Sequence, residues 1–205
     1  MPEKSTGRPR LVLTTRRIET LADGIFAIAM TLLVLTLTLP DMTQVKLSLT
    51  QLLAGQWPKF FNYVLSFLLL AIFWIVHHQQ FHIIRRTDKR HVWINIGILM
   101  FVALMPFSTD VVGDYSGETL AELVFSANLM ILGLLFLLNW VYACWHHRLV
   151  DHDLDRETII RGIRRGCITP VVAAISIILS FFVPQWGLAV YILIPIIQLY
   201  PSFRY

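Results

Sequence analysis

The sequence predicts an all-α polytopic membrane protein, and three observations support this fold class. Of the 205 residues, 56% are hydrophobic and 15% are charged, a larger apolar share than a soluble domain of this size needs. The apolar residues gather in long runs that match the length of a membrane-spanning helix, with short charged segments between them. The alternating segments typical of an outer-membrane barrel are not found in the sequence. We therefore expect a bundle of transmembrane helices.

Six apolar runs define the expected spans. A polar, basic N-terminal segment, residues 1–16, comes first, and residues 17–205 form a single transmembrane domain. The spans are expected at about 17–39, 57–84, 91–109, 118–147, 157–183 and 186–202. The first run is too long and too polar for a signal peptide, so we expect it to be retained. Six spans place both termini on the same side of the membrane.

The basic residues indicate which side that is. Fifteen of the 17 Lys and Arg residues fall in the N-terminal segment, in the second and fourth connections, and in the tail. The exceptions are Lys46 and Lys59. Because membrane-proximal basic residues are retained in the cytoplasm, we expect both termini there, in a multi-pass protein of the cell inner (plasma) membrane. Cys144 and Cys167 then lie toward the cytoplasm, where a disulfide is not expected.

The two outer connections carry acidic residues. The first, 40–56, is expected to be a modest loop, and the second carries Asp110, Asp114, Glu118 and Glu122. These carboxylates either form a rim that concentrates cations at an outer mouth, or they belong to a solvated loop with negative residues at the start of a helix.

The first apolar run carries an acid, a glycine and several threonines. At about 100° per residue, one stripe of this helix holds Gly24, Ile28, Thr31, Leu35 and Thr38. Lipid does not require hydroxyl groups, so we interpret the stripe as facing protein or water and as lining an ion path. The alternative is helix packing, in which each threonine bonds to a backbone carbonyl of the preceding turn.

Three polar residues in different runs are expected at a similar depth. Asp23, His77 and Asn95 each lie roughly 8–12 Å inside the cytoplasmic boundary, at about 1.5 Å per residue. Arg17 can extend toward them from the boundary. Because a carboxylate at this depth needs donors, we interpret the four residues as a structural polar network. It would fix the first helix against the second and third, with direct ion contact as the alternative.

The remaining motifs do not predict an enzyme or a nucleic-acid partner. The sequence has no nucleophile motif, phosphate-binding glycine loop or zinc-protease pattern, so no catalytic residue is expected. His78 and His82 lack a nearby acidic or thiol partner, so we expect no structural metal and no cofactor. The charged segment 146–165 is expected to be a solvated connection, with a metal site or pH sensor as the alternative. The net charge of +4 is not a nucleic-acid signal.

Two ordered motifs resemble the bacterial relatives of the lysosomal potassium channel called transmembrane protein 175. The first helix of that family carries Arg-x-x-x-Phe-Ser-Asp, and this chain departs from it at two positions, with Arg17-x-x-x-Leu21-Ala22-Asp23. The second motif comprises Trp74-x-x-His77-His78-x-x-Phe81, Asp88, Asn95, and Pro106-Phe107-Ser108-Thr109. Together the motifs cover about the first 115 residues.

The resemblance implies a homotetramer whose four first helices surround a central pore. Apolar side chains matching Ile28, Leu32 and Leu35 would form the constriction, and a threonine layer matching Thr31 would favour potassium over sodium. Potassium is then the permeant ion, held only transiently near Thr31, and the lipid bilayer is the other partner. The polar positions of the family match Arg17, Asp23, His77 and Asn95.

Three functions remain as hypotheses. The first is a passive potassium-selective cation channel, for which family analogy also implies proton permeation. The second is a proton-coupled secondary transporter that uses Asp23 and His77 as a relay. The third is a membrane enzyme or scaffold whose segment 146–165 carries the function.

Overall fold

The computed structural model describes residues 14–38, 48–183 and 187–199, and within these ranges every regular element is helical. Most of the basic N-terminal segment lies outside the described residues, as do Lys46 and the tail with Arg204. The expectations for those positions are therefore not addressed by the structure.

Five helices of the described chain are long and apolar enough to cross a membrane. The first is α1 (Thr15–Leu32), which continues into a short 3₁₀ helix, η1 (Leu33–Thr36). The others are α3 (Trp57–Ile83), α4 (Lys89–Asp114), α5 (Thr119–Cys144) and α6 (Arg156–Ser180). The all-helical membrane class is thus confirmed for the described chain, and these five elements coincide with the first five expected spans.

Two further segments can be compared with expectation. Residues 186–202 were expected to form a full span, and their described part contains a 3₁₀ helix, η4 (Leu188–Ile192), and a short helix, α7 (Leu193–Leu199). Because residues 184–186 and 200–205 lie outside the described chain, the sixth span stays a prediction. The 40–56 segment, expected as a loop, contains a helix, α2 (Leu49–Gly55). A capping box starts it, because Ser48 and Gln51 each bond to the other's backbone.

Acidic N-caps fix where two of the long helices begin. The Asp88 carboxylate accepts a 2.9 Å bond from the His91 N–H at the start of α4, and Asp155 accepts a 2.8 Å bond from the Thr158 N–H at the start of α6. The side-chain and backbone hydrogen bonds from Thr158 hold the pKa of Asp155 below its usual value. Each carboxylate satisfies an N–H group that would otherwise lack a partner in the first turn.

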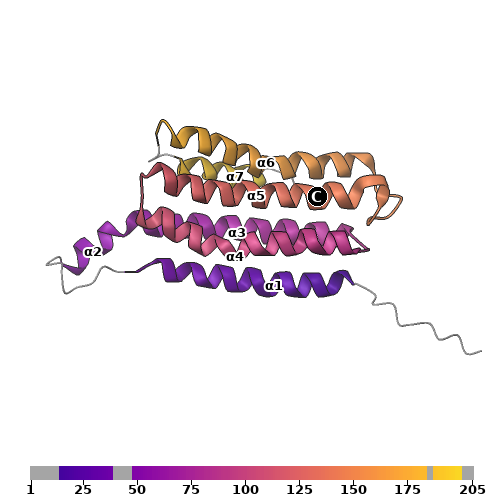
Figure 1. Cartoon of the computed structure of the whole chain (residues 1–205), viewed down its shortest axis with the longest axis horizontal. Coiled ribbons are helices and arrows are strands. Elements are labelled where there is room, and N and C mark those ends of the chain that lie inside the picture. The colour runs from indigo at the N-terminus through magenta and orange to yellow at the C-terminus, as the bar shows by residue number, and fades with distance from the viewer. Residues whose placement is uncertain (1–13, 39–47, 184–186, 200–205) are drawn as a thin grey trace, which may run out of the picture.

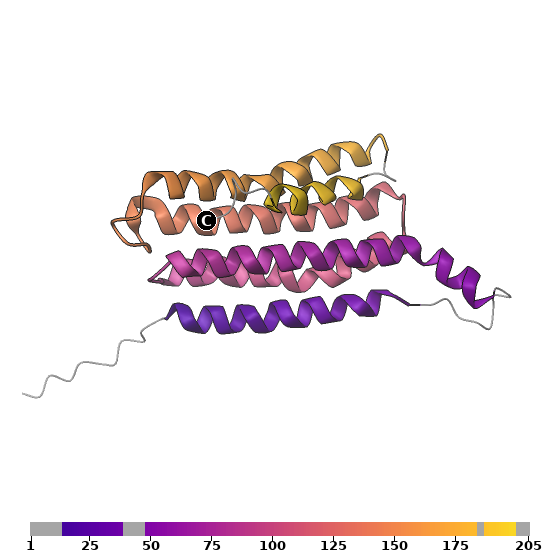
Figure 2. The same cartoon turned by 180° about the vertical axis from the view of Figure 1, so that it is seen from behind.

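The long helices lie side by side in a bundle (Figures 1 and 2). Helix α1 forms one edge, α3 and α4 follow, and α5, α6 and α7 make the other side. The larger of two apolar clusters joins these helices, with buried side chains that include Phe26, Leu69, Ile98, Leu129 and Val172. The smaller cluster, around Trp140 and Val150, lies at the α5–α6 connection.

Two glycines lie at close contacts between α5 and α6. A Cβ atom at Gly162 would lie 2.3 Å from Nε1 of Trp140, and one at Gly133 would lie 2.8 Å from Cδ of Pro170. Neither position can hold a larger residue without moving its neighbour. Trp140 also donates to the Ile159 carbonyl at 3.1 Å, which locks the indole against α6.

The start of α1, the α3–α4 turn and the α5–α6 connection lie at the same end of the bundle (Figure 1). Nearly all described basic residues belong to these segments or to the first turns of α6. At the other end the one described basic residue is Lys59, which is ion-paired with Asp114. The fold therefore gathers positive charge at one end.

Candidate functional site

One side of α1, continued through η1 to Thr38, is left uncovered by its own subunit, and we call this side the α1 face. Its buried side chains, Ala22, Phe26, Ala29 and Leu33, face the core formed with α3 and α4. The opposite side is exposed and carries Gly24, Ile28, Thr31, Leu32, Leu35 and Thr38. Ile28 is 60% exposed and Leu35 is 67% exposed. A continuous apolar face of this kind in a membrane protein meets lipid, another subunit or a pore.

Two details of this face bear on the choice among those three. A Cβ atom at Gly24 would meet nothing within 4 Å, so packing inside the subunit does not require a glycine there. The Thr31 hydroxyl donates a 2.8 Å hydrogen bond to the Ile28 carbonyl. Its hydrogen is therefore occupied, as in the packing interpretation, but its oxygen still has lone pairs on an exposed side chain. An exposed hydroxyl oxygen that can only accept is suited to meeting a cation.

The polar network forms at a buried position between α3 and α4. His77 and Asn95 are 2% and 1% exposed, and the His77 Nε2 and Asn95 Oδ1 atoms are 3.2 Å apart. The Asn95 amide nitrogen donates to the His91 carbonyl and to Asn139 Oδ1, each at 2.9 Å. The amide oxygen must then face His77, so His77 donates from Nε2.

Asp23 and Arg17 are placed differently from His77 and Asn95. The Asp23 carboxylate is exposed and accepts a 2.9 Å hydrogen bond from the Trp74 indole, and no hydrogen bond joins it to His77. Its charge nevertheless acts on the His77 ring. Arg17 is exposed at the start of α1 and makes no ion pair with the residues that the structure describes. The structure thus brings Asp23 near the network through Trp74 and leaves Arg17 outside it.

Aromatic rings link α1 to the same place. The Phe26 ring lies 6.1 Å from the His77 ring, and Phe81 stacks on His77 with ring centroids 4.5 Å apart. Helix α1 is therefore attached to α3 by a ring contact inside the core and by the Trp74–Asp23 bond at the surface.

Two amides extend the network, and sequence reasoning missed both. Asn139 of α5 donates to Gln80 Oε1 at 2.8 Å, and Gln80 donates in turn to the Phe136 carbonyl at 3.3 Å. Both side chains are buried. The sequence feature that could have identified both residues is an amide side chain in the middle of an apolar run. The network consequently spans α3, α4 and α5.

The acidic groups at the opposite end do not form a simple rim. Asp114 is neutralised by Lys59. Glu122 lies in the first turn of α5, as one of the two alternatives expected, but it is only 3% exposed, so the expectation that it is solvated is wrong. Glu118 remains exposed as the N-cap of α5.

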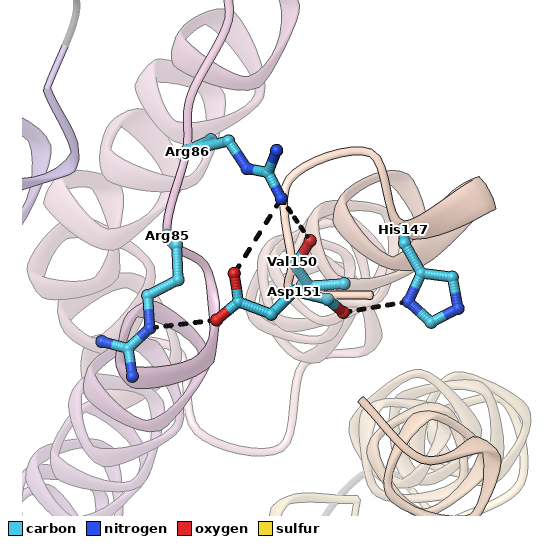
Figure 3. A network of polar contacts seen from close by, with 5 residues as sticks. All are labelled: Arg85, Arg86, His147, Val150 and Asp151. Carbon is cyan, nitrogen blue, oxygen red and sulfur yellow. Dashed lines mark hydrogen bonds and ion pairs between the residues drawn. The ribbon is translucent and has the colours of Figure 1, made fainter. Parts of the chain in front are cut away.

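The α5–α6 connection is pinned to the α3–α4 turn (Figure 3). The backbone N–H groups of Arg85 and Arg86 donate to the Leu149 carbonyl at 3.0 and 3.2 Å, and the Arg86 guanidinium donates to the Val150 carbonyl at 2.9 Å. Asp151 lies 3.8–3.9 Å from both guanidinium groups. Because Val150 is fully buried, this connection is a packed element and more than a solvated loop.

A second group of contacts holds the same two segments together. Asp88 accepts a 2.7 Å bond from the Tyr142 hydroxyl and pairs with Arg148 at 3.3 Å. Partial burial raises the pKa of Asp88, but the His91 N–H, the Tyr142 hydroxyl and the Arg148 charge outweigh it and hold this pKa below its usual value.

The remaining candidate positions are also located by the structure. His78 stacks beside Trp74 with ring centroids 6.1 Å apart. Cys144 and Cys167 are free thiols. Within residues 14–38, 48–183 and 187–199, no group of three or more His, Cys, Asp or Glu is positioned to hold a metal ion.

The helical bundle, with a polar network inside it and one exposed apolar helix face, defines a multi-pass membrane protein. A family model described as the endosomal/lysosomal potassium channel TMEM175 matches residues 17–106. A potassium channel of Streptomyces collinus is 35% identical over 68% of this chain and 67% of its own length. A potassium channel of Chamaesiphon minutus is 30% identical over 82% of this chain and 84% of its own.

A solved structure supports the same relationship. The crystal structure of a lysosomal potassium-selective channel TMEM175 homologue from Chamaesiphon minutus superposes with a TM-score of 0.81. It is 26% identical in sequence and covers 92% of this chain and 97% of that one. The chain belongs to the TMEM175 family.

Proposed function

We propose that this protein is a passive, potassium-selective cation channel and not an enzyme. The relatives and the solved homologue carry the name of potassium channel, and the observation in this chain that supports the proposal is the uncovered face of α1. Residues 17–205 would form the channel domain, preceded by the basic segment 1–16. The chain would cross the plasma membrane six times, with residues 186–202 as the last crossing and both termini in the cytoplasm.

The pore would form on the axis of a homotetramer. One helix cannot enclose a path, whereas four copies of the α1 face arranged by a closed symmetry can. Ile28 and Leu35 lie seven residues apart on that face. Rings of Ile28, Leu32 and Leu35 would stop conduction by excluding water when narrow and would permit it when the helices separate.

Thr31 would supply the polar layer between these apolar rings. Its hydroxyl hydrogen is occupied by the Ile28 carbonyl, so its oxygen lone pairs are the atoms available to an ion. Four such oxygens would replace part of the hydration shell of potassium as it passes, without a resident metal or cofactor. Proton permeation through the same path is an extension of this proposal.

The polar network would have a positioning role. His77 and Asn95 are buried away from the exposed α1 face, and Asp23 is bonded to Trp74. The network would hold α1 at a fixed rotation, so that the same face points to the axis in every subunit. Arg17 would lie at the cytoplasmic entrance. A proton-coupled transporter using Asp23 and His77 is less well supported, because no hydrogen bond among the described residues joins the two.

Ion flux from liposomes tests the proposal. Purified protein in potassium-loaded liposomes, with a protonophore present to carry the compensating charge, should release potassium down its gradient without any other substrate. When the liposomes are loaded with sodium in place of potassium, the release of sodium should be slower than the release of potassium. Flux no greater than in protein-free liposomes would overturn the proposal, and uptake that requires a second solute would favour a transporter.

A further inference from the structure

Helix α6 carries an exposed apolar stripe that is interrupted by one arginine. At about 100° per residue, a sector of about 60° on this helix holds the exposed side chains Ile160, Val171, Ile175 and Ile178. Arg164 is exposed within the same sector. Helix α6 lies on the side of the bundle opposite to α1 (Figures 1 and 2), so in a tetramer closed around α1 it would lie at the periphery. The stripe is therefore separate from the α1 face and is placed to meet lipid.

Arg164 lies inside the membrane-spanning helix and not at its end. It is the ninth residue of α6, about 12 Å along the helix from the first. The contact of Gly162 with Trp140 lies half a turn before it. Half a turn after it, a Cβ atom at Gly166 would lie 3.0 Å from Cδ1 of Leu137. Arg164 is therefore level with the part of α5 that contributes to the polar network.

The neighbouring charged groups of α6 are already bonded to each other or to other helices. Arg161 donates to the Glu157 carboxylate at 2.9 Å. Arg165 donates to glutamine side chains of α3 and α7 at 2.7 and 2.6 Å. The Arg164 guanidinium makes no hydrogen bond or ion pair with the residues that the structure describes. Because a cation at this depth is costly without a counter-charge, an anion from outside the bundle would stabilise it.

The direction of the helix determines where Arg164 can find that anion. The Cα–Cβ bonds of an α-helix tilt toward its N-terminus, and the N-terminus of α6 lies at the basic end of the bundle (Figure 1). The aliphatic part of Arg164 can therefore lie over the turn that carries Ile160, while the guanidinium reaches the lipid headgroups at that end. The anion at this level of a bilayer is a phosphodiester, whose oxygens match the paired N–H groups of a guanidinium.

We propose that Arg164 binds the phosphodiester of an anionic phospholipid in the leaflet at the basic end of the bundle. The acyl chains of this lipid would lie along the stripe toward Val171. A lipid with a net negative charge fits better than a zwitterionic one, because the exposed Arg156 at the start of α6 adds positive charge where a zwitterionic lipid carries its ammonium group. This site is not part of the proposed pore, and the proposal does not depend on ion conduction by α1.

Native mass spectrometry of the full-length protein in detergent tests the choice of ligand. Phosphatidylglycerol, phosphatidylcholine and inorganic phosphate are added in turn to the wild type. The protein should retain phosphatidylglycerol at concentrations at which phosphatidylcholine is not retained, and an excess of inorganic phosphate should not displace the lipid. Equal retention of the two lipids, or displacement by inorganic phosphate, would overturn the proposal.

Two substitutions at the same position test the residue. Arg164→Gln should bind phosphatidylglycerol about tenfold more weakly, because it loses the charged hydrogen bonds. Arg164→Lys keeps the charge without the paired N–H groups, so its affinity should lie between those of the wild type and Arg164→Gln. Since the Arg164 guanidinium has no partner in the described chain, we expect both variants to fold.

Arg90→Gln is the matched control. Arg90 is also exposed and makes no ion pair with the described residues, but it lies at the start of α4 and outside the apolar stripe. This variant should bind phosphatidylglycerol as the wild type does. Unchanged binding in Arg164→Gln would overturn the proposal, and so would an equal loss in both glutamine variants, because the lipid would then follow net charge alone.

Discussion

The Trp74 indole of α3 donates a 2.9 Å hydrogen bond to the Asp23 carboxylate of α1, across 51 positions of sequence. Among the described residues, no other side-chain hydrogen bond joins α1 to another helix. Because α1 has only one buried side, this bond and the Phe26–His77 contact determine which way the helix is turned. The orientation of the exposed α1 face therefore depends on polar and aromatic groups outside that face.

Trp74→Phe should weaken the attachment of α1. The change keeps an aromatic ring but removes the indole N–H, and a hydrogen bond to a charged group contributes about 1.5–3 kcal/mol. We expect a lower thermal unfolding temperature in detergent. The control is Trp93→Phe, because Trp93 is 71% exposed and makes no hydrogen bond within the described chain. Equal unfolding temperatures for the two variants would contradict this role.

Asn139→Leu should destabilise the bundle core. Asn139 accepts from Asn95 and donates to Gln80, so its loss leaves the Gln80 oxygen without a partner in a buried place. An unsatisfied buried group costs about 1–3 kcal/mol. Chemical denaturation should show a loss of at least that size, even though leucine is more hydrophobic. A variant as stable as the wild type would mean that the amide network does not stabilise the fold.

Asp88 should make stability depend on acid pH. Its pKa in the folded protein is below the usual value of 3.8, so its stabilising effect is complete above that value and is lost as pH falls through the lowered pKa. Asp88→Ala should cost about 1 kcal/mol at neutral pH, as loss of an N-cap does. The variant should also lose less stability than the wild type on acidification below about pH 4. If the stability of the two proteins changed with pH in parallel, Asp88 would be excluded as the source of the acid-dependent loss of stability.

Ile28→Asn should increase resting potassium leak, since a polar ring at a narrow apolar constriction admits water. The matched control is Ile178→Asn on α6, because Ile178 and Ile28 are both 60% exposed in the subunit. Liposome flux should rise for the α1 variant and stay at the wild-type level for the α6 variant. A similar change in both would point to general disruption of the membrane protein and not to a gate.

Periodicity predicted the covered and uncovered sides of α1. The expected stripe of Gly24, Ile28, Thr31, Leu35 and Thr38 is exposed along its length, because a helix buries its small and bulky apolar residues at intervals of three and four. The same reasoning located the first five long helices, since apolar runs of bilayer length have few alternative structures.

Sequence reasoning failed where the partner lies far away in the chain. Glu122 lies in the first turn of α5, where a solvated carboxylate is typical, and only the packing of the fold buries it. Asn139 and Gln80 are 59 positions apart, and nothing in either run specifies their contact. Helix α2 was missed because its seven residues are too few for a clear period.

The proposed channel requires that the exposed face of α1 line an aqueous path shared by the subunits. Thr31→Cys can be treated with a water-soluble cationic thiol reagent during potassium flux, in a background without Cys144 and Cys167. Ile178→Cys is the control for an equally exposed helix surface. The reagent should rapidly block flux through Thr31→Cys and leave flux through Ile178→Cys unchanged. Unaltered flux after reagent treatment of a Thr31→Cys protein that conducts normally would contradict the proposed channel.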